Sequence, residues 1–485
     1  MAIKYVKSFI AELEDEQGKK ITQLLWGDPI HVVNESGERA EVKARGRQGF
    51  LAKTELSDKS LLEVYVIDVG QGDGVLIKTP DGKWHLIDAG VAARAQMTKK
   101  GAANFLRWKF QEDLREESVV LENIIISHSD FDHYGGLVDV LSGRLFDGRT
   151  FPIQARNLYH CGIGRFKEEP RLGALVEGEV APFPQGSHGP RRKDKFITEL
   201  LDDKNSFANP AREFEGSFAE FAALAGSVPQ VTRRLSHRDG HLPGYAPGDN
   251  EVVIHILGPI LEAFASDRFG LREWQPESIT RNGHSVVLRF DLGRARILLT
   301  GDLNTRSQQL LLSYHPAAEF AVDVAKGCHH GSEDVSLDFV KAMKARATVI
   351  SSGDSEDFSH PRPLVLGASA RFGRESRSHK NELLPPLLYS TELARSVKLA
   401  LVASVKVDIA GAPGDFETSV TTANTKVKAL ETGAMFTPLT KTPISTDLVY
   451  GLVNVRTDGE HILCGMMEES GSDFDVKVFK AGIDV

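Results

Sequence analysis

Cysteine is scarce in this sequence of 485 residues, and no two cysteines are close enough to form a motif. The three are Cys161, Cys328 and Cys464, an odd number without a Cys-x-x-Cys pair. Disulfide-rich secreted domains and cysteine-based zinc sites depend on paired or clustered cysteines. We therefore exclude a disulfide framework and interpret the three as buried small hydrophobic residues in a reducing cytoplasm.

Long apolar runs are also lacking. No stretch reaches the roughly 20 apolar residues that a membrane-spanning helix needs. Residues 1–27 are acidic in their middle part and contain no apolar core of a signal peptide. These absences predict a cytoplasmic protein that does not partner a membrane.

Positive charge is not in excess. Lysine and arginine total 58 against 67 aspartates and glutamates, which gives a net charge of −9. A protein that binds nucleic acid over its whole surface would be basic, so the balance argues against that class. A local basic groove stays possible in principle, because a few phosphate contacts can lie on an acidic protein.

The length predicts more than one domain. Residues 1–57 contain short apolar segments, at 23–26, 30–33 and 40–44, that are separated by turn residues. Residues 46–51 resemble the end of bacterial SH3-like barrels. We expect a small all-β SH3-like barrel that either packs passively on the rest of the chain or binds a protein partner.

The sequence pattern from residue 58 to residue 485 is typical of an α/β domain. Residues 64–69 form a nearly continuous apolar run, which is typical of a strand buried on both faces. Residues 161–250 are rich in glycine, proline and charge, and we interpret them as an insertion. Residues 405–445 are a second expected insertion.

The clearest chemistry lies in the segment His128–His133, which reads His-Ser-Asp-Phe-Asp-His directly after the apolar residues 124–126. It offers two imidazoles and two carboxylates within six residues. In a loop, such spacing brings side chains together only if the chain curls around a common point. Zinc, manganese and iron accept this mixture of ligands, so the segment predicts a metal site.

A two-metal site also needs a bridging carboxylate and a closing ligand from elsewhere in the chain. The apolar residues 297–299 lead into Thr-Gly-Asp and place Asp302 at the end of a strand. His360 lies in a loop soon after the apolar residues 348–350. Alone, Asp302 could be a turn residue and His360 a surface histidine, but in this order we expect both to be ligands.

These motifs, in this order, resemble the metallo-β-lactamase superfamily and, more narrowly, the hydrolase domain of ComEC-type DNA-uptake proteins. Besides the segments above, the resemblance rests on four further motifs: Asp68–Asp73, Leu86–Gly90, Asn282–Leu288 and His329–Ser332. It implies an α/β fold in which a four-layer αβ/βα sandwich holds the metals at one edge, between the two sheets.

The resemblance also implies two divalent ions, Zn²⁺ or Mn²⁺, that share the carboxylate of Asp302. One ion would be bound further by Asp132, His133 and His360. The other would be bound further by His128, Asp130 and a third histidine, for which His160 is the best placed. The wider superfamily usually has histidine at the position of Asp130, and a carboxylate there favours manganese over zinc.

Other residues would act around the metals. The catalytic candidates are Asp132 and the adjacent His329 and His330, of which His330 is preferred for stabilising charge or protonating a leaving group. The side chains expected to support the ligands are Asp68, Asp73, Asp88, Asn282 and Ser285. For Asp68 and Asp73 a turn-forming role is the alternative.

Two metals that share a water can hydrolyse phosphodiesters, but also lactams, thioesters and lactones. The resemblance favours nucleic acid as substrate. The basic residues expected to contact its phosphates are Arg191, Arg192 and Lys193 in the insertion, and Arg371 and Arg374 after His360. Solvated loop charges are the alternative for both groups.

We therefore expect a cytoplasmic, metal-dependent nuclease or phosphodiesterase that acts on DNA or RNA. One alternative is a hydrolase of a small phosphodiester or another ester. A second is a non-catalytic scaffold that recruits partners through the SH3-like barrel. The chain lacks the transmembrane segments of the uptake proteins, so the resemblance predicts their chemistry and not their transport.

Overall fold

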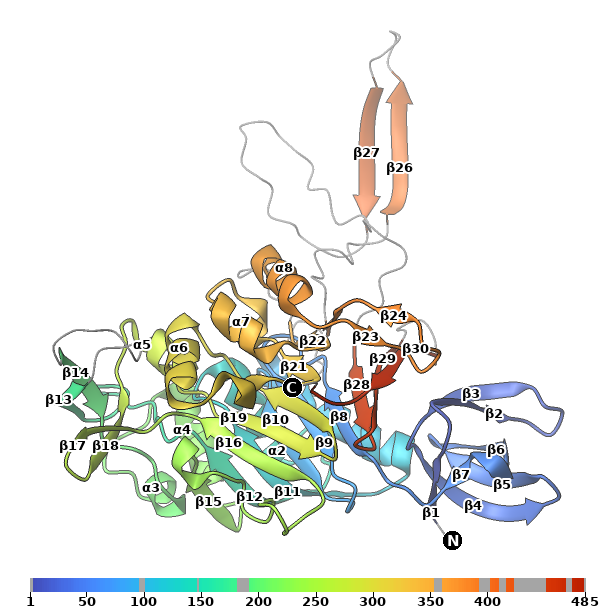
Figure 1. Cartoon of the computed structure of the whole chain (residues 1–485), viewed down its shortest axis with the longest axis horizontal. Coiled ribbons are helices and arrows are strands. Elements are labelled where there is room, and N and C mark those ends of the chain that lie inside the picture. Colours follow the sequence, from blue (N-terminus) through green and yellow to red (C-terminus); the bar gives the residue numbers. More distant parts are fainter. Residues whose placement is uncertain are drawn as a thin grey trace.

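The computed structural model describes residues 3–95, 101–145, 148–180, 192–352, 360–391, 402–409, 416–422, 451–467 and 473–483. Two large β-sheets face each other, and helices cover their outer surfaces. The N-terminal strands form a separate sheet beside this body (Figure 1).

The N-terminal sheet has seven antiparallel strands in the order β3-β2-β6-β5-β4-β1-β7. They are β1 (Ile3–Val6), β2 (Ile10–Glu14), β3 (Lys20–Leu25), β4 (Pro29–Ser36), β5 (Arg39–Ala44), β6 (Arg47–Ala52) and β7 (Leu56–Ser57). Alternate residues such as Leu13, Ile30 and Val42 are fully buried in its own core. The expected all-β N-terminal part is confirmed, while its SH3-like identity and its status as a separate domain stay predictions.

The first large sheet has nine strands in the order β15-β12-β11-β10-β9-β8-β28-β29-β30. They are β8 (Leu62–Val66), β9 (Gly74–Lys78), β10 (Trp84–Ala89), β11 (Val119–Ile126), β12 (Ile153–His160), β15 (Val231–Arg234), β28 (Val453–Thr457), β29 (His461–Met467) and β30 (Phe474–Lys480). The strands β10, β11, β12 and β15 run parallel, so their carboxyl ends meet at one edge of the sheet.

The second large sheet has six strands in the order β16-β19-β20-β21-β22-β25. They are β16 (Val253–Gly258), β19 (Val287–Leu292), β20 (Ala295–Leu299), β21 (Val324–Lys326), β22 (Ala347–Ile350) and β25 (Leu387–Ser390). One hydrophobic core joins the two sheets: Val64 and Ile77 of the first belong to the same buried cluster as Leu288 and Ile297 of the second. The sheets therefore pack face to face.

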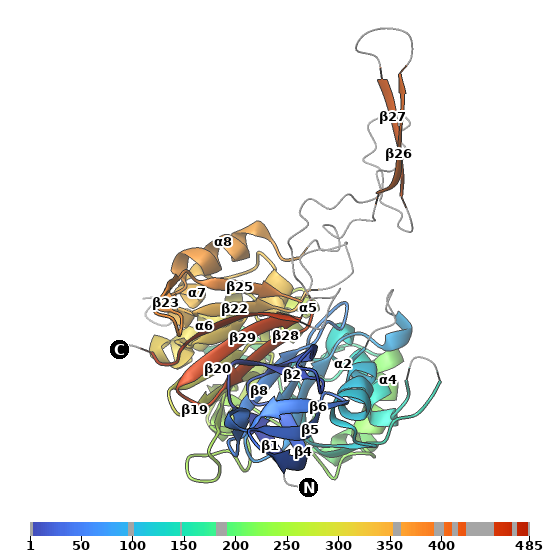
Figure 2. The same cartoon turned by 90° about the vertical axis from the view of Figure 1, so that its right-hand side faces the viewer.

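Helices cover the two outer faces (Figure 2). On the nine-stranded sheet lie α1 (Ala102–Arg107), a π-helix (Trp108–Leu114), α2 (Phe131–Ser142), α3 (Lys204–Ala208) and α4 (Gly216–Ala225). On the six-stranded sheet lie α5 (Glu277–Gly283), α6 (Thr305–Tyr314), α7 (Leu337–Met343) and α8 (Pro363–Phe372). This arrangement confirms the expected four-layer αβ/βα sandwich.

The remaining strands form small sheets. A four-stranded sheet joins β13 (Leu175–Val180), β14 (Arg192–Ile197), β17 (Glu262–Ala265) and β18 (Arg268–Arg272). Two hairpins consist of β23 (Ser376–Arg377) with β24 (Leu383–Leu384) and of β26 (Val402–Ile409) with β27 (Phe416–Thr422). The expected insertion 161–250 contributes α4 and β15 to the main body. Among the described residues, every helix is too short or too polar to cross a membrane.

A buried ionic network ties the N-terminal sheet to the nine-stranded sheet. The guanidinium of Arg456, on β28, has no exposed surface and lies 2.8 Å from Oδ1 of Asp28. Asp28 also accepts a hydrogen bond from Arg45 at 2.7 Å. Glu63, on β8, lies 2.9 Å from the Nζ atom of Lys78 and 3.8 Å from Arg456. The carboxylates of both sheets therefore share one buried cation.

Burial by itself would raise the pKa values of Asp28 and Glu63. The neighbouring cations outweigh it: Arg45 and Arg456 hold the pKa of Asp28 below its ordinary value, and Lys78 and Arg456 do the same for Glu63. Both groups are therefore charged at neutral pH in the folded protein.

The substitution Arg456→Leu should lower the free energy of unfolding by about 3–5 kcal/mol, because it leaves two buried carboxylates without a shared cation. Urea unfolding followed by circular dichroism measures this. Arg156→Leu is the control: its guanidinium is 48% exposed and meets Glu122 at 2.7 Å, so the loss should stay below about 1 kcal/mol. Equal losses in the two variants would contradict a special role for the buried network.

The stability difference between the wild type and Arg456→Leu should depend on pH. In the wild type, the lowered carboxyl pKa values stabilise the folded state above the unfolded pKa values of about 4, and this stabilisation is lost as the pH falls. In the variant, protonation relieves the uncompensated charge. The difference should therefore be largest at neutral pH and shrink below about pH 5. A difference that stays constant from neutral to acidic pH would show that charge is not its cause.

Candidate metal centre

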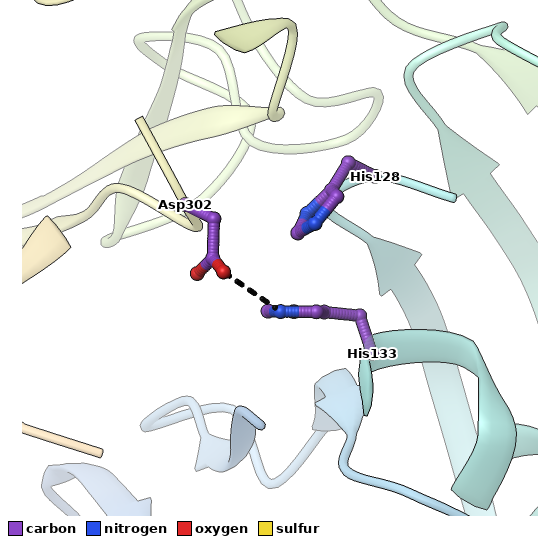
Figure 3. A group of neighbouring side chains, drawn as sticks. All are labelled: His128, His133 and Asp302. Atoms are coloured by element: carbon purple, nitrogen blue, oxygen red, sulfur yellow. Dashed lines mark ion pairs between the residues drawn. The ribbon is translucent and has the colours of Figure 1, made fainter. Parts of the chain in front are cut away.

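The centre lies where loops from the two large sheets meet. Ser127 and His128 follow β11, and His133 lies in the first turn of α2. Asp302 follows β20, and His329 and His330 follow β21. Figure 3 shows His128 and His133 pointing toward Asp302 from the opposite sheet. The carboxyl ends of strands thus deliver these residues to one place, as expected from the sequence.

Asp302 is the centre of the group. Its Oδ2 atom lies 2.9 Å from Nε2 of His330, 3.3 Å from Nε2 of His133 and 3.8 Å from Nε2 of His329. The Asp302 side chain is only 3% exposed. A buried carboxylate of this kind needs several polar partners, and the imidazoles provide them.

Asp88 orients His133. Its Oδ1 atom accepts a hydrogen bond from the backbone N–H of Ser127 at 2.7 Å, and its Oδ2 atom accepts one from the Ser127 hydroxyl at 2.6 Å. The same Oδ2 lies 2.8 Å from Nδ1 of His133. Because Nδ1 is engaged, the Nε2 atom of His133 is directed toward Asp302. This is the supporting contact that a histidine ligand requires.

Ser285 supports the centre from the other sheet. Its hydroxyl accepts a hydrogen bond from the backbone N–H of Asp302 at 3.0 Å and lies 3.3 Å from Nδ1 of His128. Asp68, by contrast, accepts from the backbone N–H of Gly70 at 3.3 Å, which is a turn contact. A Cβ atom at Gly72 would lie 1.7 Å from the carbonyl oxygen of Asp132. Only a glycine therefore fits at position 72, where the turn approaches the centre.

A buried lysine belongs to the centre and was missed in the sequence. Lys326, at the end of β21, forms an ion pair with Asp73, and its Nζ atom lies 3.7 Å from Oδ1 of Asp302. It also donates a hydrogen bond to the carbonyl oxygen of Gly301 at 3.0 Å. The available signal was a lysine that closes an apolar strand, since a charge in that position must find a buried partner.

The backbone is strained where the two adjacent histidines project. His329 and His330 have φ angles of +46° and +52°, and Asp88 has a φ of +54°. Residues other than glycine rarely adopt this left-handed conformation, which costs roughly 1–3 kcal/mol each and concentrates at functional sites. At His330, the Nδ1 atom forms a hydrogen bond with the carbonyl oxygen of Ser351 at 3.0 Å, and Oδ1 of Asp73 lies 3.2 Å from the same atom.

The histidines of the centre differ in the direction in which their pKa values are shifted. Burial would lower the pKa of His330, but Asp302 and Asp73 raise it to about 10, and Asp302 and Asp88 raise the pKa of His133 well above its ordinary value. Burial dominates at His128, whose pKa is well below its ordinary value. The centre therefore attracts positive charge to the space around Asp302.

Unpaired buried atoms show that the centre suits a cation. The Nε2 atoms of His128, His133 and His330 and the Oδ1 atom of Asp302 are buried without a hydrogen-bond partner among the described residues. Ligand atoms from His128, His133 and Asp302 all lie within 4.8 Å of one another, as do those from Asp132, His133 and His330. Buried imidazole nitrogens and carboxylate oxygens are ligands for Zn²⁺ and Mn²⁺, so these residues fit a divalent ion.

The centre opens into a cavity of about 410 Å³. Its lining combines candidate ligands with other charged groups and is formed by Gln71, Gly72, Asp130, Phe131, Asp132, Arg165, Ser278, Ile279, Arg281, Asn282, Asp302, His329, His330 and His360. The ring of His360 lies 5.8 Å from that of His329, and burial lowers its pKa to about 4. Asp132, His329 and His360 are therefore placed to meet a substrate or an ion.

His160 lies elsewhere. Its Nδ1 atom accepts a hydrogen bond from the backbone N–H of Gly162 at 3.1 Å, and its ring packs against Phe207. None of the ligand groups found among the described residues includes it. Its role as third histidine ligand stays a prediction. The histidine that lies beside Asp302 is His330, with Nε2 at 2.9 Å from Oδ2.

The basic residues expected to contact substrate do not line this cavity. Arg371 lies on α8, Lys193 is exposed on β14, and Arg374 donates to the backbone carbonyl oxygen of Lys344 at 2.8 Å. Arg191 lies outside the described residues, as does the side chain of Arg192. The basic groups that do line the cavity, Arg165 and Arg281, were not singled out in the sequence.

The fold and this centre are those of a known family. Residues 67–353, more than half of the chain, match the model of the metallo-beta-lactamase superfamily, and the chain belongs to that superfamily. It is therefore a hydrolase of the metallo-β-lactamase fold, a fold that implies the binding of divalent metal.

Individual relatives narrow the comparison. ComE operon protein 3 of Bacillus subtilis is 30% identical over 321 residues, which are 63% of this chain and 30% of that protein. Recombination protein 2 of Haemophilus influenzae is 22% identical over 315 residues, 65% of this chain and 27% of that protein. The chain thus spans less than a third of the length of these relatives. The predicted resemblance to the ComEC-type hydrolase domain is confirmed.

Among solved structures, the chain is similar to Tm1679, a metal-dependent hydrolase of the beta-lactamase superfamily. The two are 11% identical with a TM-score of 0.33, and the match covers 68% of this chain and 96% of that chain.

Asp88→Asn should weaken the binding of Mn²⁺ or Zn²⁺ about 10- to 100-fold, because it removes the carboxylate that orients His133. Titration of the metal-free protein with each ion, followed by calorimetry, measures the affinity. Asp139→Asn is the matched control: Asp139 lies at the other end of α2 and accepts from the backbone N–H of Ala93. If both variants bind metal as tightly as the wild type, Asp88 does not support a ligand.

Proposed function

We propose that this chain is a metal-dependent phosphodiester hydrolase that cleaves nucleic acid, with DNA as the first candidate. The observation that carries the proposal is the cavity itself. It joins a buried histidine–aspartate group to two arginines, so a site for divalent ions and groups that attract phosphate share one space.

Two similarities support nucleic acid as the substrate class. The sequence resembles the hydrolase domain of ComEC-type DNA-uptake proteins, and one curated relative bears the name recombination protein. Recombination is a process that acts on DNA, so a DNA phosphodiester is the first bond to test.

The chain's own residues would divide the work as follows. His128, His133, His330, Asp132 and Asp302 would hold the ions, with His360 as a further ligand. Two bound divalent ions supply a hydroxide at neutral pH and stabilise charge on a phosphate oxygen. Cleavage rates measured with Zn²⁺ and with Mn²⁺ would show which ion supports the activity.

His329 is the candidate for moving a proton. It lines the cavity, and 25% of its side chain is accessible. Burial lowers its pKa from the ordinary value, which leaves the imidazole neutral and able to accept a proton at neutral pH. His330, which the sequence favoured for this role, is enclosed by Asp73 and Asp302 and is better placed to bind an ion.

A small phosphodiester is the second candidate substrate. A cavity of about 410 Å³ is large enough for a nucleotide-sized ligand. Recruitment of a partner by the N-terminal sheet stays a prediction. A non-catalytic scaffold is the weaker hypothesis, because the candidate ligands and a cavity beside them are both present.

Purified protein should cleave single- or double-stranded DNA when Mn²⁺ is added, and EDTA should abolish the cleavage. Asp132→Ala should reduce the rate by roughly 100-fold or more, because it removes a carboxylate that faces both the metals and the cavity. Parallel assays with RNA, with Zn²⁺ and with bis-p-nitrophenyl phosphate identify the polymer, the ion and any preference for a small diester.

Asp338→Ala is the control for this assay, since its carboxylate is 80% exposed on α7 and lies outside the cavity lining. It should cleave at the wild-type rate. Cleavage that survives EDTA or Asp132→Ala would point to a contaminating nuclease. A metal-loaded wild type that hydrolyses no phosphodiester would overturn the proposed function.

A further inference from the structure

Asp130 lies between the metal centre and two arginines. Its Oδ1 atom accepts hydrogen bonds from two arginines: Arg281 through Nε, and Arg165 through Nη1 at 3.1 Å. In the amide orientation that satisfies both ends of Asn282, that side chain donates to Oδ2 at 2.8 Å. The nearest histidine atom, Nε2 of His128, is 3.8 Å from Oδ2. The carboxylate is therefore engaged mainly by cations of the protein itself.

The two arginines come from distant parts of the chain. Arg165 follows β12 at the start of the expected insertion, whereas Arg281 lies on α5 of the opposite layer. Their side chains are 24% and 14% exposed, and both line the cavity that contains Asp302 and His329. Among the described residues, no other lysine or arginine lines that cavity. An anion that enters the cavity can therefore meet the permanent positive charge of these two guanidinium groups.

Further contacts with the protein fix the two guanidinium groups. Arg165 forms an ion pair with Glu215 through Nε and donates from Nη1 to the carbonyl oxygen of Ser129 at 3.2 Å. Nη1 of Arg281 lies 3.7 Å from Glu277. Among the described residues the Nη2 groups of both arginines have no partner. The two guanidinium groups are thus fixed in place, and their Nη2 groups remain able to donate. This arrangement can bind a phosphate.

We propose that Arg165 and Arg281, positioned by the Oδ1 atom of Asp130, bind a phosphate group of the substrate beside the metal centre. This inference rests on the proposed function, because it names the substrate group that the same cavity holds. It gives Asp130 a positioning role through Oδ1, and the role of ligand expected for Asp130 stays a prediction for Oδ2. The phosphate belongs to a nucleotide unit, either in a strand or free.

The pair Arg165 and Arg281 forms an arginine clamp. It is tested by measuring how tightly the metal-loaded protein binds ligands that it does not cleave. The probes are thymidine 5′-monophosphate and a short single-stranded DNA with phosphorothioate linkages. Arg165→Gln and Arg281→Gln should each weaken the binding of both probes about tenfold, which is the loss of one charge-assisted hydrogen bond. The dependence of DNA affinity on salt should also fall by about one phosphate contact per arginine.

Metal content separates the two roles of Asp130. In Asp130→Asn protein that holds as many ions as the wild type, monophosphate binding should be weaker, because the two arginines lose their anchor. Undiminished binding at wild-type metal content would contradict the positioning role of Asp130. Arg156→Gln, on β12 and outside the cavity lining, is the control and should bind both probes like the wild type.

Further variants keep the test decisive. If a glutamine variant melts at a clearly lower temperature, Arg165→Lys and Arg281→Lys retain the charge and lose only the fork, so they should bind with intermediate affinity. Undiminished binding in folded variants of both arginines would contradict the clamp. Tighter binding of the oligonucleotide than of the monophosphate would indicate a strand as the natural ligand, and the reverse a free nucleotide.

The outcome is independent of the proposed hydrolysis. If the wild type cleaves no diester but monophosphate binding depends on the two arginines, the hydrolase proposal fails and the clamp stands. If DNA is cleaved but the arginine variants bind both probes normally, the hydrolase proposal stands and the clamp fails.

Discussion

The burial of one carboxylate determines much of this structure. Asp302 is nearly inaccessible to water, and a charge in that position must be compensated by cations or hydrogen-bond donors nearby. The compensation comes from His133 on the nine-stranded sheet and from His330 and Lys326 on the six-stranded sheet. These contacts join the two sheets at this point, and the same packing places buried ligand atoms without hydrogen-bond partners near one another.

Hydrogen bonds within the protein fix the side chains of the centre. Asp88 fixes Ser127 and His133, and Ser285 fixes the backbone of Asp302. Left-handed backbone at His329 and His330 is sustained by the same surroundings. An ion that binds does not have to order these side chains, so little of its binding free energy is lost to conformational entropy.

Local patterns in the sequence predicted the main ligand candidates, and the resemblance to the metallo-β-lactamase superfamily implied the four-layer fold. Apolar runs that end in His-Ser-Asp-Phe-Asp-His or Thr-Gly-Asp identify strand ends, and strand ends of an α/β sandwich converge. Arg165 and Arg281 were not predicted, because a single charged residue in an insertion or a short helix has no periodicity. Strand β30 (Phe474–Lys480) was not predicted, although its alternation of apolar and charged residues is the pattern of a half-buried strand.

The buried pairing of Arg456 with Asp28 and Glu63 has a consequence for synthesis on the ribosome. The strand that carries Arg456 lies between β8 and β29, so β8 is an edge strand until this late segment emerges. Until then the nascent chain exposes the β8 edge, and Asp28 and Glu63 lack the guanidinium that they share. Such an edge can pair with other chains, so the nascent chain is prone to aggregate until β28 covers it.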